Sequence, residues 1–289
     1  MKAIVFGGSG FLGSHVADCL TARGYAVTIF DVKSSPYLSP NQTMVVGDIQ
    51  DEAAVFQAIA GQDIVYNFAG IADLDDATTK PLLTVGLNVQ GNLNIMEGCL
   101  RTPVKRFVYA STIYVYSQKG GFYRCSKQAA EIYIEEYQRH YGLDYTILRY
   151  GTLYGPRADA RNSIYRYLKQ ALEEGRIVCQ GNGEEMREYI HVTDAARLTA
   201  DIVHDDYRNR HIIITGHYPM KFKEMLQTIS EILGGKIRIE FTGKESVNHY
   251  TLTPYSFAPK IGHKLVNHCY LDMGQGLLEC LYEMHGHEH

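Results

Sequence analysis

Short apolar runs alternate with amphipathic stretches along the first half of the chain. The run at 2–6 (KAIVF) predicts a strand buried on both faces, and the amphipathic stretch at 11–23 predicts a helix. The predicted strands lie at 2–6, 26–30, 43–47, 63–67, 106–110 and 144–148, and the predicted helices at 11–23, 51–60, 80–100 and 123–141. Such strict alternation predicts a doubly wound α/β fold, in which helices cover both faces of a parallel sheet.

The alternation loosens after about residue 152, where polar, loop-rich segments surround two further predicted helices, at 163–175 and 221–233. We predict a first domain over 1–152 and a smaller, mixed second domain over 153–289. Part of 189–214 is expected to pack back on the first domain.

Composition and charge exclude several classes of protein. Of the 289 residues, 45% are hydrophobic and 21% charged, and the formal net charge is −4, so no basic surface for nucleic acid is expected. No apolar run approaches 18 residues, which argues against membrane insertion. The N-terminal apolar run is too short for a signal peptide, and the six cysteines form no CxxC pair, so we predict a cytoplasmic protein with reduced thiols. The tail HGHEH is interpreted as a frayed polar terminus, and no metal site is predicted.

A glycine-rich turn, GGSGFLG at 7–13, follows the first predicted strand and opens the first predicted helix. Gly7 permits a tight turn, Gly10 lets a pyrophosphate approach the backbone, and Gly13 lets helix and strand pack closely. The backbone amides of Phe11 and Leu12 then face the diphosphate at the helix start. This context predicts a Rossmann-type dinucleotide site.

An acidic residue ends the second predicted strand. The carboxylate of Asp31 can accept hydrogen bonds from both hydroxyls of an adenosine ribose and would repel a 2′-phosphate, so NAD is favoured over NADP. The alternative is that Asp31 merely caps the turn before Ser34. At the end of the third strand, Asp48 is placed to take the adenine amino group, with Ile49 beside the ring. After the fourth strand, small or apolar residues let a cofactor cross the strand ends, and these are Phe68, Ala69 and Gly70.

A tyrosine and a lysine stand four apart on a predicted helix, so Tyr123 and Lys127 share one face. The lysine ammonium is expected to lower the pKa of the tyrosine, so that Tyr123 takes the proton of an alcohol while Thr112 hydrogen-bonds its oxygen and a nicotinamide accepts hydride. Lys127 would also bind the nicotinamide ribose. This spacing is common by chance in a chain with 22 tyrosines, and a surface helix is the alternative. Its place after the fifth strand of a dinucleotide fold favours catalysis.

These ordered motifs together resemble an extended short-chain dehydrogenase/reductase of the NAD-dependent epimerase/dehydratase family, which acts on nucleotide sugars. The resemblance continues through NVQG at 88–91, LRYGTLYGPR at 148–157 and REYIHVTDAAR at 187–197. It implies that Asn88 braces the active-site helix, that Tyr150 lies by the nicotinamide, and that Asn162 and Arg187 hold the nucleotide diphosphate. A surface ion pair with Glu184 or Glu185 is the alternative for Arg187.

The resemblance also bears on the reaction. Dehydratases of this family carry an acidic pair directly after the catalytic Thr, whereas this chain has Ile113 and Tyr114 there. A nucleotide-sugar epimerase acting at C4 through a 4-keto intermediate is therefore favoured. The alternatives are a dehydrogenase or 4-ketoreductase with net NAD(H) turnover, and a dinucleotide-sensing protein without catalysis.

Three departures from the family pattern concern the substrate. Thr152 stands where the family places an Asn for the sugar or its phosphates, and Gln180 where an aromatic often stacks on the base. The segment 113–122 before Tyr123 is short, which predicts a more open sugar pocket. The helices at 80–100 and 123–141 correspond to those that pair in dimers of the family, so a homodimer is predicted.

Overall fold

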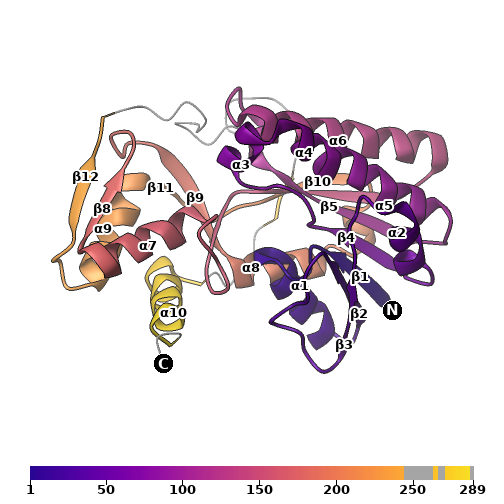
Figure 1. Ribbon diagram of the computed structural model, residues 1–289, viewed down its shortest axis with the longest axis horizontal. Helices are drawn as coiled ribbons and strands as arrows, with labels where there is room; N and C mark the ends of the chain where they lie inside the picture. Colours follow the sequence, from indigo (N-terminus) through magenta and orange to yellow (C-terminus); the bar gives the residue numbers. More distant parts are fainter. Residues whose placement is uncertain (244–262, 266–270, 287–289) are drawn as a thin grey trace.

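A parallel sheet of eight strands forms the larger part of the protein, in the order β13-β10-β6-β5-β4-β1-β2-β3 (Figure 1). The computed structural model describes residues 1–243, 263–265 and 271–286. The strands are β1 (Lys2–Phe6), β2 (Ala26–Asp31), β3 (Gln42–Val46), β4 (Ile64–Asn67), β5 (Arg106–Thr112), β6 (Tyr145–Tyr150), β10 (Arg210–Ile214) and β13 (His263–Lys264). Every neighbouring pair is parallel. The predicted doubly wound class is confirmed, and the order reverses between β1 and β4, where such sheets bind ligands.

Helices cover both faces of this sheet. On one face, α1 (Phe11–Ala22) and α8 (Val192–Asp201) share an apolar core with the strands. On the other, α2 (Glu52–Ile59), α5 (Gly91–Leu100) and α6 (Gly121–Tyr141) share a second core. Because both faces are covered, strands such as β4 are buried along their whole length, which explains their continuous apolar runs.

The helix predicted over 80–100 is not uniform. It consists of α4 (Pro81–Val85), a π-helical turn η1 (Gly86–Gln90) and α5, and a short helix α3 (Leu74–Thr79) precedes it. The side chain of Asn88, in the π-helical turn, contacts the backbone of Ile71 and the hydroxyl of Ser126. A π-helical turn inserts one extra residue per turn, and such turns often mark functional sites.

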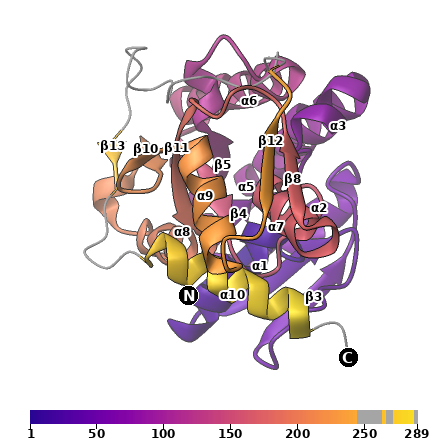
Figure 2. The same ribbon diagram turned by 90° about the vertical axis from the view of Figure 1, so that its left-hand side faces the viewer.

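The smaller part of the protein is mixed, as predicted (Figure 2). Its strands form a sheet of β7 (Thr152–Tyr154), β9 (Met186–His191) and β11 (Pro219–Lys221), and a pair of β8 (Arg176–Cys179) and β12 (Arg238–Phe241). In the sheet, β7 and β9 are parallel, whereas β9 and β11 are antiparallel. Its helices α7 (Ser163–Glu174), α9 (Phe222–Ile232) and α10 (Met273–Gly286) enclose a third apolar core.

Two segments beyond residue 189 lie on the larger part. The helix α8 packs beside α1, and β10 pairs with β6.

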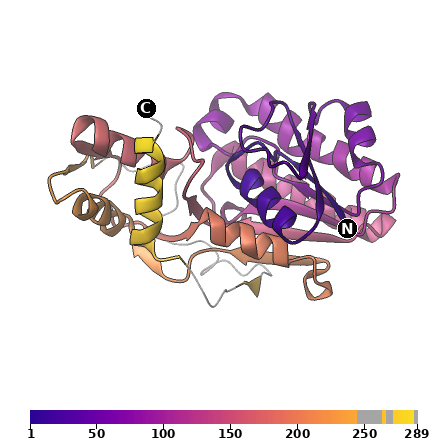
Figure 3. The same cartoon turned by 90° about the horizontal axis from the view of Figure 1, so that it is seen from below.

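The helix α10, yellow in Figure 3, lies beside the smaller part and packs on α9. Short 3-10 helical turns also occur at η2 (Ile113–Tyr116) and η3 (Asp205–Tyr207).

None of the described helices is both long enough and apolar enough to cross a bilayer. Within the same part of the chain, no three His, Cys, Asp or Glu side chains are grouped to hold a metal ion. Residues 287–289 of the histidine-rich tail lie outside the described residues.

Candidate active and cofactor site

The glycine-rich turn forms a cradle that leaves no room for side chains. Gly7 has φ +75°, and a Cβ added there would lie 2.6 Å from the backbone nitrogen of Ala69. A Cβ on Gly13 would lie 2.2 Å from the carbonyl oxygen of Gly7. Gly10 is the N-cap of α1, and no side chain caps this helix start, so the first amides, including those of Phe11 and Leu12, are left for another acceptor. The cradle fits a diphosphate.

Asp31 lies beside this cradle at the end of β2. One oxygen of its carboxylate accepts a hydrogen bond from the backbone of Ser9 (3.1 Å), and the other lies 3.4 Å from the backbone nitrogen of Lys33. Asp31 therefore joins the glycine-rich turn to the turn after β2, and its contact with a ribose stays a prediction. At the end of β3, Asp48 is exposed and Ile49 is buried against Gly91.

The chain leaves β4 through Phe68 and Ala69 to Gly70, which has φ +140°. A Cβ on Gly70 would lie 2.3 Å from the Oδ1 atom of Asn88, so the backbone and this amide pack closely. Asn88 in turn donates to Ser126 on α6 (2.9 Å). The strand end beside the cofactor site and the helix that carries Tyr123 are thus linked through one buried amide.

The predicted catalytic side chains come together. Thr112 ends β5 and its side chain is hydrogen-bonded to the hydroxyl of Tyr123, which lies in the first turn of α6. Lys127 lies one turn further along α6, and its ammonium donates to the carbonyl of Ala110 (2.8 Å). All three side chains are buried. The ten residues between Thr112 and Tyr123 therefore suffice to bring the two hydroxyls together.

The protonation of this group differs from the expectation. Burial raises the pKa of Tyr123 to about 12, although the hydrogen bond with Thr112 acts to lower it. The pKa of Tyr123 is therefore raised and not lowered as predicted, because burial outweighs the Lys127 ammonium, which lies 6.0 Å from the centre of the tyrosine ring and donates to Ala110. Burial also lowers the pKa of Lys127 to about 8. A phenolate at Tyr123 therefore requires further positive charge in the site, such as an oxidised nicotinamide.

The segment after Thr112 turns inward. Ile113, Val115 and Tyr116 are buried in a small apolar cluster with Ile213 of β10. Tyr114 places its ring edge-on to Tyr123, with 6.3 Å between the ring centroids. This segment, residues 113–122, contains no acidic side chain that could reach the site beside Thr112. Whether the sugar pocket is open stays a prediction.

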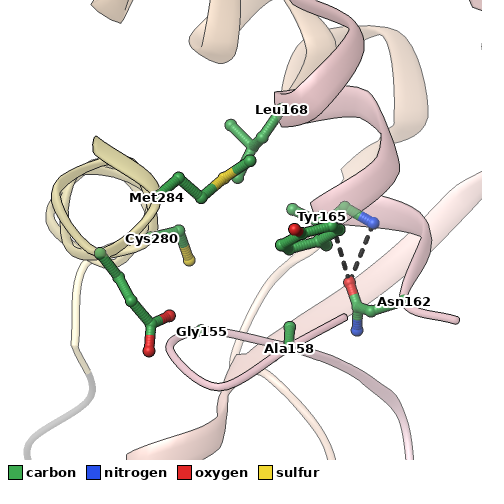
Figure 4. A pocket seen from close by; sticks show the side chains of 9 residues that line it. Gly155, Ala158, Asn162, Tyr165, Leu168, Cys280 and Met284 are labelled. Atoms are coloured by element: carbon green, nitrogen blue, oxygen red, sulfur yellow. Dashed lines mark hydrogen bonds between the residues drawn. The ribbon is translucent and has the colours of Figure 1, made fainter. Parts of the chain in front are cut away.

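Tyr150 and Asn162, two further predicted site residues, are hydrogen-bonded within the protein. The hydroxyl of Tyr150 lies 2.6 Å from that of Thr199 on α8, on the face of the sheet opposite α6. The Oδ1 atom of Asn162 accepts the backbone N–H groups of Ile164 and Tyr165 and so caps α7 (Figure 4). A structural role thus accounts for most of the hydrogen bonds of Asn162, and its contact with a diphosphate stays a prediction.

The remaining predicted substrate residues lie on the smaller part of the protein. Thr152 pairs with Tyr189 in the small sheet, Arg187 lies on β9, and Gln180 is exposed after β8. Glu184 forms ion pairs with Lys221 and Lys223. The sequence analysis missed a buried ion pair beside the site, which Glu131 forms with Arg149. Two signals for this pair were present in the sequence. Arg149 is a charged residue within the apolar strand sequence YTILRY, and Glu131 lies one helical turn after Lys127.

Comparisons with known proteins agree with this geometry. Residues 3–214 match the model of the NAD dependent epimerase/dehydratase family. The chain is 27% identical over 255 residues to a putative UDP-glucose 4-epimerase of Methanocaldococcus jannaschii, covering 80% of this chain and 82% of that one. It is 30% identical over 229 residues to a dTDP-glucose 4,6-dehydratase of Streptomyces antibioticus, covering 70% and 68%.

Among solved structures, the fold is similar to that of UDP-glucuronic acid 4-epimerase from Bacillus cereus in complex with UDP-glucuronic acid and NAD. The TM-score is 0.85 at 22% identity, and 99% of each chain is covered. The cofactor predicted from the glycine-rich turn and Asp31 is thus confirmed as NAD. The chain belongs to the NAD dependent epimerase/dehydratase family.

Proposed function

We propose that the protein is an NAD-dependent nucleotide-sugar epimerase acting at C4. The observation that carries this proposal is the grouping of Thr112, Tyr123 and Lys127 at the same edge of the parallel sheet as the glycine-rich turn, with Ile113 and Tyr114 directly after Thr112. Elimination of water from the sugar requires an acid and a base near C5 and C6, and neither of these side chains can serve. Proton transfer at one hydroxyl requires only Tyr123 and Thr112.

The proposed mechanism assigns one task to each side chain. Tyr123 accepts the proton of the sugar 4-hydroxyl and later returns it, while Thr112 hydrogen-bonds the same oxygen. NAD, held by the glycine-rich turn and Asp31, would supply reversible hydride transfer at C4 of the sugar. Lys127 holds positive charge behind Tyr123, and the start of α6 adds the positive end of its dipole.

The nucleotide diphosphate is proposed to lie between the two parts of the protein. Arg187 on β9 is suited to phosphate, because a guanidinium presents parallel N–H groups to two oxygens. Gln180 can hydrogen-bond the edge of a base, and Thr152 can contact the sugar. The UDP-sugar names of the epimerases above favour a uridine nucleotide.

The purified protein should be incubated with UDP-glucose, UDP-glucuronic acid, UDP-N-acetylglucosamine and dTDP-glucose. We expect one of them to give its 4-epimer, with no net change in the absorbance of NADH. Steady accumulation or consumption of NADH would indicate a dehydrogenase or a ketoreductase, and a 4-keto-6-deoxy product would indicate a dehydratase. If no sugar on this panel reacts while NAD remains bound by native mass spectrometry, the epimerase proposal fails for these substrates.

We also propose that α4 and α6 form a homodimer interface. Both helices carry large apolar side chains on solvent-facing positions, which are costly to leave in water and typical of an interface. Those most exposed are Leu82 (88%), Tyr141 (63%), Ile132 (61%), Val85 (53%), Phe122 (52%) and Tyr133 (46%).

Ile132→Asp is expected to give a monomer at micromolar concentration, because it places a charge in the centre of the apolar face of α6. Light scattering after size-exclusion chromatography measures the mass of the unchanged protein and of the variant. Tyr218→Asp, at a residue 79% exposed on the smaller part, is the control and should leave the dimer intact. An unchanged protein that is already monomeric would contradict the proposal.

A further inference from the structure

Three consecutive residues at the end of β5 are each tied to one side chain of α6. The pairs are Ala110 with Lys127, Ser111 with Glu131 and Thr112 with Tyr123. Two of these pairs contain the predicted catalytic groups. The third places the carboxylate of Glu131, itself buried, one helical turn after Lys127.

The carboxylate of Glu131 is held by a buried network. It accepts hydrogen bonds from the hydroxyl of Ser111 (2.5 Å) and from the Nε and Nη2 atoms of Arg149 (3.1 and 2.6 Å). Arg149 also donates to the hydroxyl of Tyr116 (2.6 Å) and contacts the Nδ1 atom of His211 (3.3 Å). A buried ion pair is a weak source of net stability compared with apolar packing. Stability alone therefore does not explain this network, and a function in the active site is expected.

We propose that Glu131 is a positioning residue of the active site, which keeps Lys127 charged and in place behind Tyr123, while Ser111 and Arg149 fix its carboxylate. This inference rests on the proposed function, because it assigns Lys127 the task of supporting a phenolate at Tyr123. A lysine ammonium out of water tends to lose its proton, and a nearby negative charge opposes that loss. In this protein, burial lowers the pKa of Lys127 and Glu131 acts to raise it.

Several titratable groups surround Lys127 and Glu131. Those facing Lys127 or Glu131 from α6, β5, β6, η2 and β10 are Tyr123, Glu135, Tyr109, Tyr145, Arg149, Tyr116 and His211. Glu135 is paired with His211 (3.1 Å), at the outer end of the network. On the other side of α6, α5 presents Glu97 to Tyr137, nearly three turns beyond Lys127. Glu131 is the carboxylate whose charge acts on Lys127.

The decisive measurement is the titration of the Lys127 ammonium by NMR in protein labelled with ¹⁵N-lysine, with the signal assigned by its absence in Lys127→Met. In Glu131→Gln we expect the pKa of Lys127 to fall below that of the unchanged protein. The alkaline limb of the kcat profile should move to lower pH by the same amount. We expect kcat to fall about 10-fold to 100-fold with little change in KM, as for other losses of positioning. Glu131→Asp, which keeps the charge, should recover part of both effects.

A matched control is available on α7, where Lys169 and Glu173 have the same spacing on the surface (3.6 Å). Glu173→Gln should leave the activity nearly unchanged, because exposed pairs are screened by water. If Glu131→Gln fails to fold, Glu131→Gln/Arg149→Met removes both buried charges and should restore folding without restoring the pKa of Lys127.

An unchanged pKa of Lys127 in a folded Glu131 variant would overturn the inference and leave Glu131 a purely structural role. The NMR titration needs no substrate. It therefore decides this point even if every nucleotide sugar on the panel fails to react, an outcome that would count against the proposed function alone.

Discussion

Tyr123→Phe is expected to lower kcat for 4-epimerisation by about 1000-fold, because loss of a positioned acid–base group costs roughly 10²–10⁴ in rate. The variant loses the hydroxyl that is hydrogen-bonded to Thr112, while its ring stays buried and edge-on to Tyr114. The fold and the cofactor cradle are untouched. NAD should therefore still be present by native mass spectrometry, and KM should change little.

Initial rates with the reactive nucleotide sugar from the panel measure this effect. Tyr282→Phe is the control, since that tyrosine is 72% exposed on α10 and should keep full activity. Activity within about 10-fold of the unchanged enzyme would show that Tyr123 is not the acid–base group. It would then favour another proton acceptor for the 4-hydroxyl.

The sheet was predictable from sequence because its physical cause is local. Strands buried on both faces need continuous apolar runs, and helices need amphipathic ones, so β1 and α1 could be placed almost to the residue. Where a side chain caps a helix, the observed helix boundary differs only slightly from the predicted one. Asp51, expected within the first turn of α2, is its N-cap and accepts the amide of Ala54.

What could not be predicted depends on contacts between distant residues. The π-helical turn at Gly86–Gln90 is one example. The resemblance implied that Asn88 braces the active-site helix, but no local pattern indicates the π-helical turn from which its side chain reaches Ile71 and Ser126. The pKa of Tyr123 depends on how deeply the ring is buried and on where the Lys127 ammonium points. Spacing on a helix gives only the shared face of the two side chains.

The roles of the substrate residues are predictable only in part for the same reason. Asn162 was expected to bind phosphate, yet its side chain caps α7. Both tasks suit an amide at a helix start, so the sequence cannot separate them.

Gly7→Ala is expected to abolish NAD binding and to lower the free energy of unfolding by about 2–6 kcal/mol. Two effects add at this position. The alanine must adopt φ near +75°, and its Cβ would lie 2.6 Å from the backbone nitrogen of Ala69. Neither the glycine-rich turn nor the end of β4 can yield without moving the backbone that faces the diphosphate. Urea unfolding and the NAD content of the purified variant measure the two consequences.

The control separates strain from overlap. Gly142, just after α6, has φ +72°, but a Cβ added there meets nothing within 4 Å. Gly142→Ala therefore carries the same backbone penalty without the clash, and should cost about 1 kcal/mol while leaving NAD bound. If the two variants lose equal stability, the backbone conformation alone explains Gly7. If Gly7→Ala unfolds less readily than expected but still loses NAD, the close approach to Ala69 serves the cofactor more than the fold.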